Sequence, residues 1–164
     1  MCRLCYVFVL LFSSTFLYAQ RVDTVSGSSL KKELCLLTGV GYSKHAFIDL
    51  GVSSNRFGTI GHHLFASAFF ASSELHFGNK IVIGPKVGAW ASGGVGGIAM
   101  GVNMIYYSDF EKGSLVFKPE IGFGQSKFKL TYGYNARLTN TSFDRIPKSV
   151  VEATYCFRLK ARGS

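Results

Sequence analysis

The sequence predicts an all-β fold: an eight-stranded antiparallel up-and-down transmembrane β-barrel with a polar lumen filled by side chains. Oily and polar residues alternate along several segments of strand length, as in strands that have one apolar and one polar face. Only 16% of the residues are charged, against roughly 25% in typical soluble domains. Hydrophobic residues reach 48%, yet no segment beyond the N-terminus is an apolar run long enough for a spanning helix. Such a chain can cross a bilayer only as a closed barrel.

Residues 1–19 predict a cleavable secretory signal peptide. Arg3 supplies a positive charge, residues 5–12 (CYVFVLLF) form a short apolar core, and residues 17–19 (LYA) provide a cleavage site before Gln20. The apolar core is shorter than the roughly 20 residues of a spanning helix, so an uncleaved anchor is disfavoured. The chain is therefore expected to be exported.

Residues 20–32 are expected to be a polar leader, residues 33–160 the barrel and residues 161–164 a tail. Turn signals such as Gly78-Asn79 separate eight alternating segments. These segments suit bilayer-spanning strands, which need about 9–11 residues at a tilt. The expected strands are 33–42, 45–55, 62–77, 80–92, 95–107, 113–124, 127–138 and 148–160.

Alternation alone does not decide which face of the barrel wall points inward. A soluble lipocalin-like barrel would place the oily face inside. Here the polar face also carries most of the strand glycines and charges of both signs, which suits a narrow, crowded interior with paired charges. We therefore expect the oily face to point outward. The charged residues expected in a structural lumen network are Asp49, Glu74, Lys86, Lys118, Glu120, Lys129, Arg137, Glu152 and Arg158.

Two pairs in this network follow from the expected strand pairing. A two-residue turn at Gln125-Ser126 would place Glu120 diagonal to Lys129, and Arg137 should lie near Glu152. An eight-stranded barrel leaves an interior just wide enough for side chains. A permanent channel is therefore disfavoured.

Two cysteines of the mature chain fall on strands that must become neighbours when the barrel closes. Cys35 and Cys156 both occupy strand positions expected to face the lumen, and both lie near the same end of the barrel. An oxidising compartment would allow them to form a disulfide, provided that the register brings them together. Sequence leaves that register open, and the absence of CxxC spacing disfavours redox catalysis.

One set of residues has the composition of a hydrolase site. Ser72, Glu74 and His76 share one strand face, but neighbours on such a face are about 6.5–7 Å apart, too far for direct contact between short side chains. The adjacent His62 and His63 point to opposite faces, so a shared metal ion is not expected. We expect no catalytic, cofactor-binding or metal-binding residues.

The signal peptide, the eight amphipathic segments and the closing segment VVEATYCFRLK (residues 150–160) carry a resemblance to a known class. The chain resembles the small eight-stranded outer-membrane β-barrel proteins of Gram-negative bacteria, of OmpA- and OmpX-type architecture. That resemblance implies location in the outer membrane, contact with its lipids and insertion by the barrel-assembly machinery. It implies no single activity, because members serve as adhesins, anchors and lipid-modifying enzymes.

The expected function is a structural or interaction role without a reaction, as a monomer. Recognition would fall to the loops at 139–148 and 108–113. Two alternatives stay open: a soluble periplasmic lipid-binding barrel, and an outer-membrane lipid hydrolase that uses Ser72, Glu74 and His76. Nucleic acid is not an expected partner, since the exported chain has no basic tract.

Overall fold

The structure is a computed structural model that describes residues 29–60, 63–78, 80–94, 97–125, 127–140, 142–143 and 145–162. The expected signal peptide and residues 20–28 of the expected leader lie outside these ranges. The described residues contain no helix that is long and apolar enough to cross a membrane.

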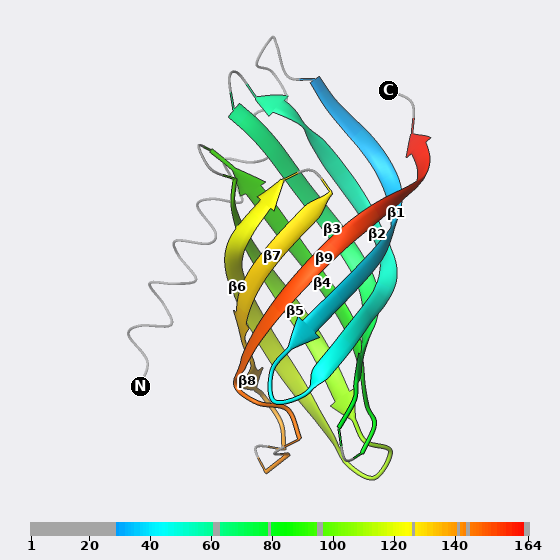
Figure 1. Ribbon diagram of the computed structural model, residues 1–164, viewed down its shortest axis with the longest axis vertical. Helices are drawn as coiled ribbons and strands as arrows, with labels where there is room; N and C mark the ends of the chain where they lie inside the picture. The colour runs from blue at the N-terminus through cyan, green and yellow to red at the C-terminus, as the bar shows by residue number, and fades with distance from the viewer. Residues whose placement is uncertain are drawn as a thin grey trace.

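The described residues form a closed antiparallel β-barrel of eight strands (Figure 1), which confirms the predicted all-β, up-and-down barrel architecture. Each strand pairs with its neighbours in chain order, β1 pairs with β9, and the β5–β6 pairing joins the ends of the sheet order into a ring. β8 continues β7 beyond Asn135, since both pair with β6. The strands are β1 Ser29–Tyr42, β2 Ala46–Ile60, β3 His63–His76, β4 Val82–Gly93, β5 Ile98–Ser108, β6 Gly113–Gln125, β7 Phe128–Tyr134, β8 Ala136–Arg137 and β9 Ser149–Arg162.

Three strands run well beyond the segments predicted from the alternation of apolar and polar residues. β1 begins at Ser29, so residues 29–32 of the expected leader belong to the barrel wall. β2 runs to Ile60 rather than ending at residue 55, and β9 runs to Arg162 in the expected tail. Residues 29–32 pair with β2, and Lys32, opposite Arg56, also pairs with Arg162 of β9. Backbone pairing satisfies N–H and C=O groups whatever the side chains are, so a polar segment can extend a strand.

The two ends of the barrel differ in their connections. The start of β1, the end of β9 and the connections β2–β3, β4–β5 and β6–β7 lie at the upper end in Figure 1, which we call the terminal end. The other four connections lie at the lower end, which we call the loop end. The longest of them, residues 138–148, joins β8 to β9.

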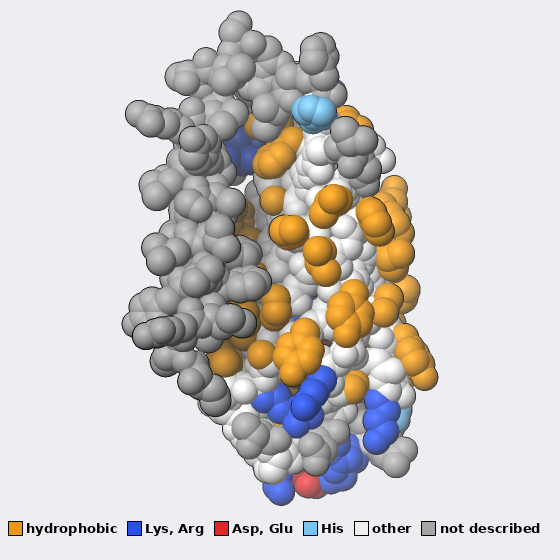
Figure 2. All heavy atoms as spheres, turned by 90° about the vertical axis from the view of Figure 1, so that its left-hand side faces the viewer, with side chains coloured by type: hydrophobic (Ala, Val, Ile, Leu, Met, Phe, Trp, Pro, Cys, Tyr) orange, Lys and Arg blue, Asp and Glu red, His pale blue; other side chains and the backbone are white. Residues whose placement is uncertain are grey.

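Apolar side chains cover most of the outer wall, and several charged side chains are buried inside. Phe69 is 68% exposed and Val40 62% exposed, whereas Asp49 and Lys118 are fully buried. Figure 2 shows apolar side chains over the height of one face of the wall, with Lys and Arg gathered toward the loop end. Strand period 2 produces this separation, because successive side chains point to opposite faces.

A β-bulge in β9 changes which residues face outward near the terminal end. The register shifts between Leu34 and Cys35, so that Cys35 pairs with Arg158 while Leu34 pairs with Lys160. One extra residue on a bulged strand reverses the parity of the residues beyond it. Lys160 therefore lies on the outer face with Leu34, although simple alternation from residue 150 placed it on the polar inner face.

Part of the connection at 138–148 packs into the barrel at the loop end. Phe143 and Ile146 are buried among interior residues of β4, β5 and β6, including Ile105 and Tyr107. The Arg137 guanidinium donates to the Ile146 carbonyl oxygen at 2.6 Å. The sequence suggested that this loop serves recognition, but its apolar side chains pack into the barrel.

A second contact fixes the loop end. Asp109 accepts hydrogen bonds from the backbone N–H groups of Lys112 at 2.8 Å and Glu111 at 3.2 Å, and its Oδ2 lies 3.4 Å from Arg145 Nε. The hydrogen bonds from Lys112 and Glu111, with the nearby Arg145 charge, hold the pKa of the Asp109 carboxyl below its usual range. Asp109 thereby links the β5–β6 turn to the 138–148 loop.

Candidate functional site: the charged interior of the barrel

Five charged side chains from five strands meet inside the barrel, and we call them the central cluster. Each lies on the inward parity of its strand, and none is more than 3% exposed. Closing the sheet brings together residues that are far apart in sequence. The cluster consists of Asp49 of β2, Glu74 of β3, Lys86 of β4, Lys118 of β6 and Glu152 of β9.

Each ammonium group of the central cluster is shared between carboxylates. Lys86 Nζ lies 2.6 Å from Asp49 Oδ2, 2.9 Å from Glu74 Oε1 and 3.0 Å from Glu152 Oε1. Lys118 Nζ lies 2.8 Å from both Glu74 Oε1 and Glu152 Oε2. Buried charges are tolerated only when they are paired and hydrogen-bonded, and this interlocked arrangement meets that requirement for both lysines.

Glu74 is the most extensively bonded carboxylate of the cluster. Its Oε2 accepts a hydrogen bond from the Tyr107 hydroxyl at 2.5 Å and lies 3.0 Å from His76 Nε2. The His76 ring stacks on Phe47, with 4.4 Å between ring centroids. The spacing argument that residues two apart on one strand do not touch is therefore wrong for Glu74 and His76, because the longer glutamate side chain bridges the gap.

Ser72 does not join this contact. Its hydroxyl is buried and has no hydrogen-bond partner among the described residues. A nucleophilic serine needs a base within hydrogen-bond reach, and the hydrogen-bond partner that the structure gives His76 is Glu74. The structure thus brings together two of the three residues that sequence grouped as a hydrolase set.

Glu120 and Lys129 form a second buried ion pair, closer to the terminal end. Asn103 Nδ2 donates to Glu120 Oε2 at 3.1 Å, and Lys129 Nζ lies 5.7 Å from the centre of the Trp90 ring. The ring face attracts the ammonium. The Glu120–Lys129 ion pair and the Trp90 ring therefore help to fill the interior between the central cluster and the terminal end.

The register between β6 and β7 differs from the expected one by two residues. Gln125 belongs to β6 and pairs with Phe128, and Lys129 faces Gly124. The expected turn at Gln125-Ser126 is wrong. A shift of two residues keeps every side chain on its face, which explains why Glu120 and Lys129 still meet.

Arg137 and Arg158, both expected in the lumen network, lie outside the central cluster. Glu152 pairs opposite Thr131 in β7 rather than near Arg137, and Arg137 donates to the 138–148 loop. Arg158 is 57% exposed at its side chain and lies 3.4 Å from Glu33 Oε1 at the terminal end. The expected proximity of Arg137 to Glu152 is therefore wrong.

Both described cysteines are buried free thiols. Leu37 faces Cys156 across the β1–β9 seam, while Cys35 faces Arg158, so the two cysteines are diagonal rather than opposed. They pack in an apolar layer with Trp90 and other residues at the terminal side of the charges. The disulfide that the sequence left open is not formed in this structure.

The carboxylates of Asp49, Glu74 and Glu152 lie close enough together to resemble a metal site. Each offers an oxygen within 4.8 Å of the others. The ammonium groups of Lys86 and Lys118 already occupy the space between these oxygens. The three carboxylates are therefore arranged to pair with the two lysines inside the barrel rather than to hold a metal ion.

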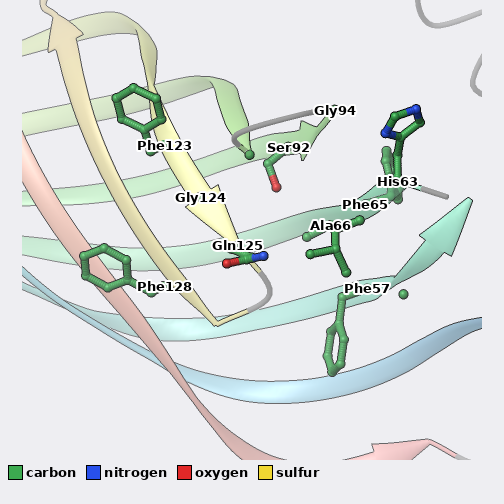
Figure 3. A pocket seen from close by; sticks show the side chains of 13 residues that line it. Phe57, His63, Phe65, Ala66, Ser92, Gly94, Phe123, Gly124, Gln125 and Phe128 are labelled. Carbon is green, nitrogen blue, oxygen red and sulfur yellow. The ribbon is translucent and has the colours of Figure 1, made fainter.

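A cavity of about 530 Å³ opens at the terminal end of the barrel. Figure 3 shows its mouth, where Phe57, Phe123 and Phe128 come from β2, β6 and β7, and Ala66 comes from β3. Its polar lining includes Ser92 together with His63 and Gln125. The cavity is mainly apolar and contains none of the charges of the central cluster.

No family model, no curated protein and no solved structure matches this chain.

Proposed function

We propose that this chain is an outer-membrane β-barrel protein of Gram-negative bacteria, of the OmpA/OmpX architectural class, with a structural or interaction role. The observation that carries the proposal is the pairing of an apolar outer wall with a buried, compensated ion cluster. The terminal end would face the periplasm and the loop end the exterior. Outer-membrane lipids and, during insertion, the barrel-assembly machinery are its proposed partners.

The outer wall supports a lipid environment. Large apolar side chains such as Phe69, Phe123 and Leu159 are more than half exposed, and each buried square ångström of apolar surface is worth roughly 25 cal/mol. Soluble monomers rarely expose continuous apolar surfaces of this extent. A soluble lipid-binding barrel would need these residues inside, which is the opposite orientation.

The interior supports a structural role rather than a channel. The central cluster fills the middle of the barrel, and Phe143 and Ile146 pack into the loop end. Toward the terminal end, Trp90 and Phe70 pack with the cysteines. A side-chain-filled interior fits the narrow bore of eight strands.

The lipid-hydrolase alternative receives less support. Its Ser72 hydroxyl is buried without a described partner, and its Glu74 is engaged with Lys86, Lys118 and Tyr107. A carboxylate committed to two ammonium groups is poorly placed to orient a catalytic histidine.

Fractionation of a Gram-negative host that expresses the full chain tests the proposal. We expect the protein in the outer-membrane fraction, released only by detergent, and faster migration on gels before boiling than after it, because a closed barrel resists detergent until heated. A soluble periplasmic protein and a resident outer-membrane barrel serve as controls. Release into the periplasmic fraction without detergent would overturn the proposal in favour of the soluble barrel.

A further inference from the structure

A basic patch lies on the outer face of β2, β1 and β9 at the terminal end. Lys32 pairs with Arg56 on one side and with Arg162 on the other, and the neighbouring outward pair on β1 and β9 is Leu34 with Lys160. The side chains of Lys32, Arg56 and Lys160 are exposed. Adjacent strands lie about 4.8 Å apart, so Arg56 and Lys32 are direct cross-strand neighbours.

The β-bulge assembles this patch. Arg158, before the shift, sits opposite the inward-facing Cys35, whereas Lys160, after it, sits opposite the outward-facing Leu34. Without the extra residue, Lys160 would keep the inward parity of Cys156 and Arg158. β1, β2 and β9 also reach further at this end than β6 and β7 (Figure 1), which carries the patch to the edge of the wall.

The patch has no acidic counterpart on its own face. The outward positions of β1, β2 and β9 that the structure describes include no Asp or Glu. Glu33, which follows Lys32 on β1, is buried on the inner face and lies against Arg158. At the loop end, by contrast, Lys80 is paired with Glu111 at 2.6 Å and Arg145 lies near Asp109.

Apolar wall continues directly from the patch toward the middle of the barrel. Leu34, Leu36, Val52 and Phe157 are each between 38% and 52% exposed on the same strands. A lipid has a charged phosphate headgroup at one end and apolar acyl chains at the other. The basic patch at the terminal end would therefore face the headgroup, and the apolar wall beside it would face the acyl chains.

We propose that Lys32, Arg56 and Lys160 bind the phosphate of an anionic phospholipid headgroup at the terminal end of the barrel. This inference rests on the proposed function, since it places the patch at the periplasmic surface of the membrane. The apolar wall beside the charges favours a lipid over an acidic protein. The headgroup binds by charge-assisted hydrogen bonds from the ammonium and guanidinium groups.

The test titrates a short-chain phosphatidylglycerol into the full chain, folded in micelles of a zwitterionic detergent, and follows backbone amide shifts by NMR. We expect saturable shifts around Lys32, Arg56 and Lys160, and none of comparable size with phosphatidylcholine. The variant K32Q/R56Q/K160Q should bind on the order of a hundredfold more weakly at low salt, since each charge near a lipid surface contributes about fivefold.

The matched control K44Q/K112Q/K148Q removes three basic residues at the loop end and should retain the native affinity. Unchanged affinity in K32Q/R56Q/K160Q, or shifts spread evenly over the barrel, would overturn the proposal. Heat-modifiable gel mobility of the same samples reports the closed barrel independently. A folded barrel without phosphatidylglycerol selectivity would therefore refute the patch alone, whereas an unfolded chain would count against the barrel in lipid.

Discussion

Lys118→Met is expected to lower the free energy of unfolding of the barrel by about 3–5 kcal/mol, as for other buried ion pairs that lose one partner. Lys118 is fully buried and neutralises Glu74 and Glu152, each at 2.8 Å. Methionine keeps most of the side-chain volume but removes the charge. Three buried carboxylates would then share only Lys86.

Urea unfolding of the protein in detergent micelles, followed by gel mobility without boiling, measures this loss. Lys112→Met, on the exposed β5–β6 turn, is the matched control and should change the free energy of unfolding by less than about 0.5 kcal/mol. Adding Glu152→Gln to Lys118→Met restores the charge balance and should recover part of the loss. Equal unfolding midpoints for Lys118→Met and Lys112→Met would contradict the role given to the central cluster.

Phe69→Arg is expected to destabilise the barrel in lipid by about 2–4 kcal/mol, the cost of an arginine on the lipid face near the bilayer midplane. Phe69 lies midway along β3, 68% exposed, between Ser54 of β2 and Ala89 of β4. The arginine side chain is too far from either rim to reach water without distorting the bilayer.

Folding into phosphatidylcholine vesicles at increasing urea concentration measures this cost. Phe110→Arg is the matched control, because Phe110 is 78% exposed at the β5–β6 turn of the loop end and would lie in water or among headgroups. Equal stability of Phe69→Arg and the native chain in vesicles would show that this wall does not face lipid.

The sequence predicted the orientation of side chains better than the details of pairing. Strand period 2 decides the face of each residue, so Lys118 and Glu152 were correctly placed inside. Alternation does not determine the position of a turn, and several polar residues near Gln125 suit a tight turn. The error of two residues was harmless to Glu120 and Lys129, because an even shift preserves the face.

Other features depend on contacts that alternation does not encode. The bulge beside Leu34 turns Lys160 outward, and no local pattern marks it. Phe143 and Ile146 enter the barrel because the loop end offers them apolar neighbours such as Ile105, which only the folded barrel brings together. The Glu74–His76 contact depends on side-chain reach rather than on backbone spacing.

Quenching of tryptophan fluorescence by brominated lipid acyl chains tests the central claim most directly, because the chain has a single tryptophan. Trp90 is 5% exposed in the interior, whereas Phe69 lies on the outer wall. In vesicles of brominated phosphatidylcholine, the tryptophan introduced by Phe69→Trp in a Trp90→Phe background should be strongly quenched, and Trp90 of the native chain only weakly. Stronger quenching of Trp90 than of the introduced tryptophan would contradict an apolar wall facing lipid around a charged interior.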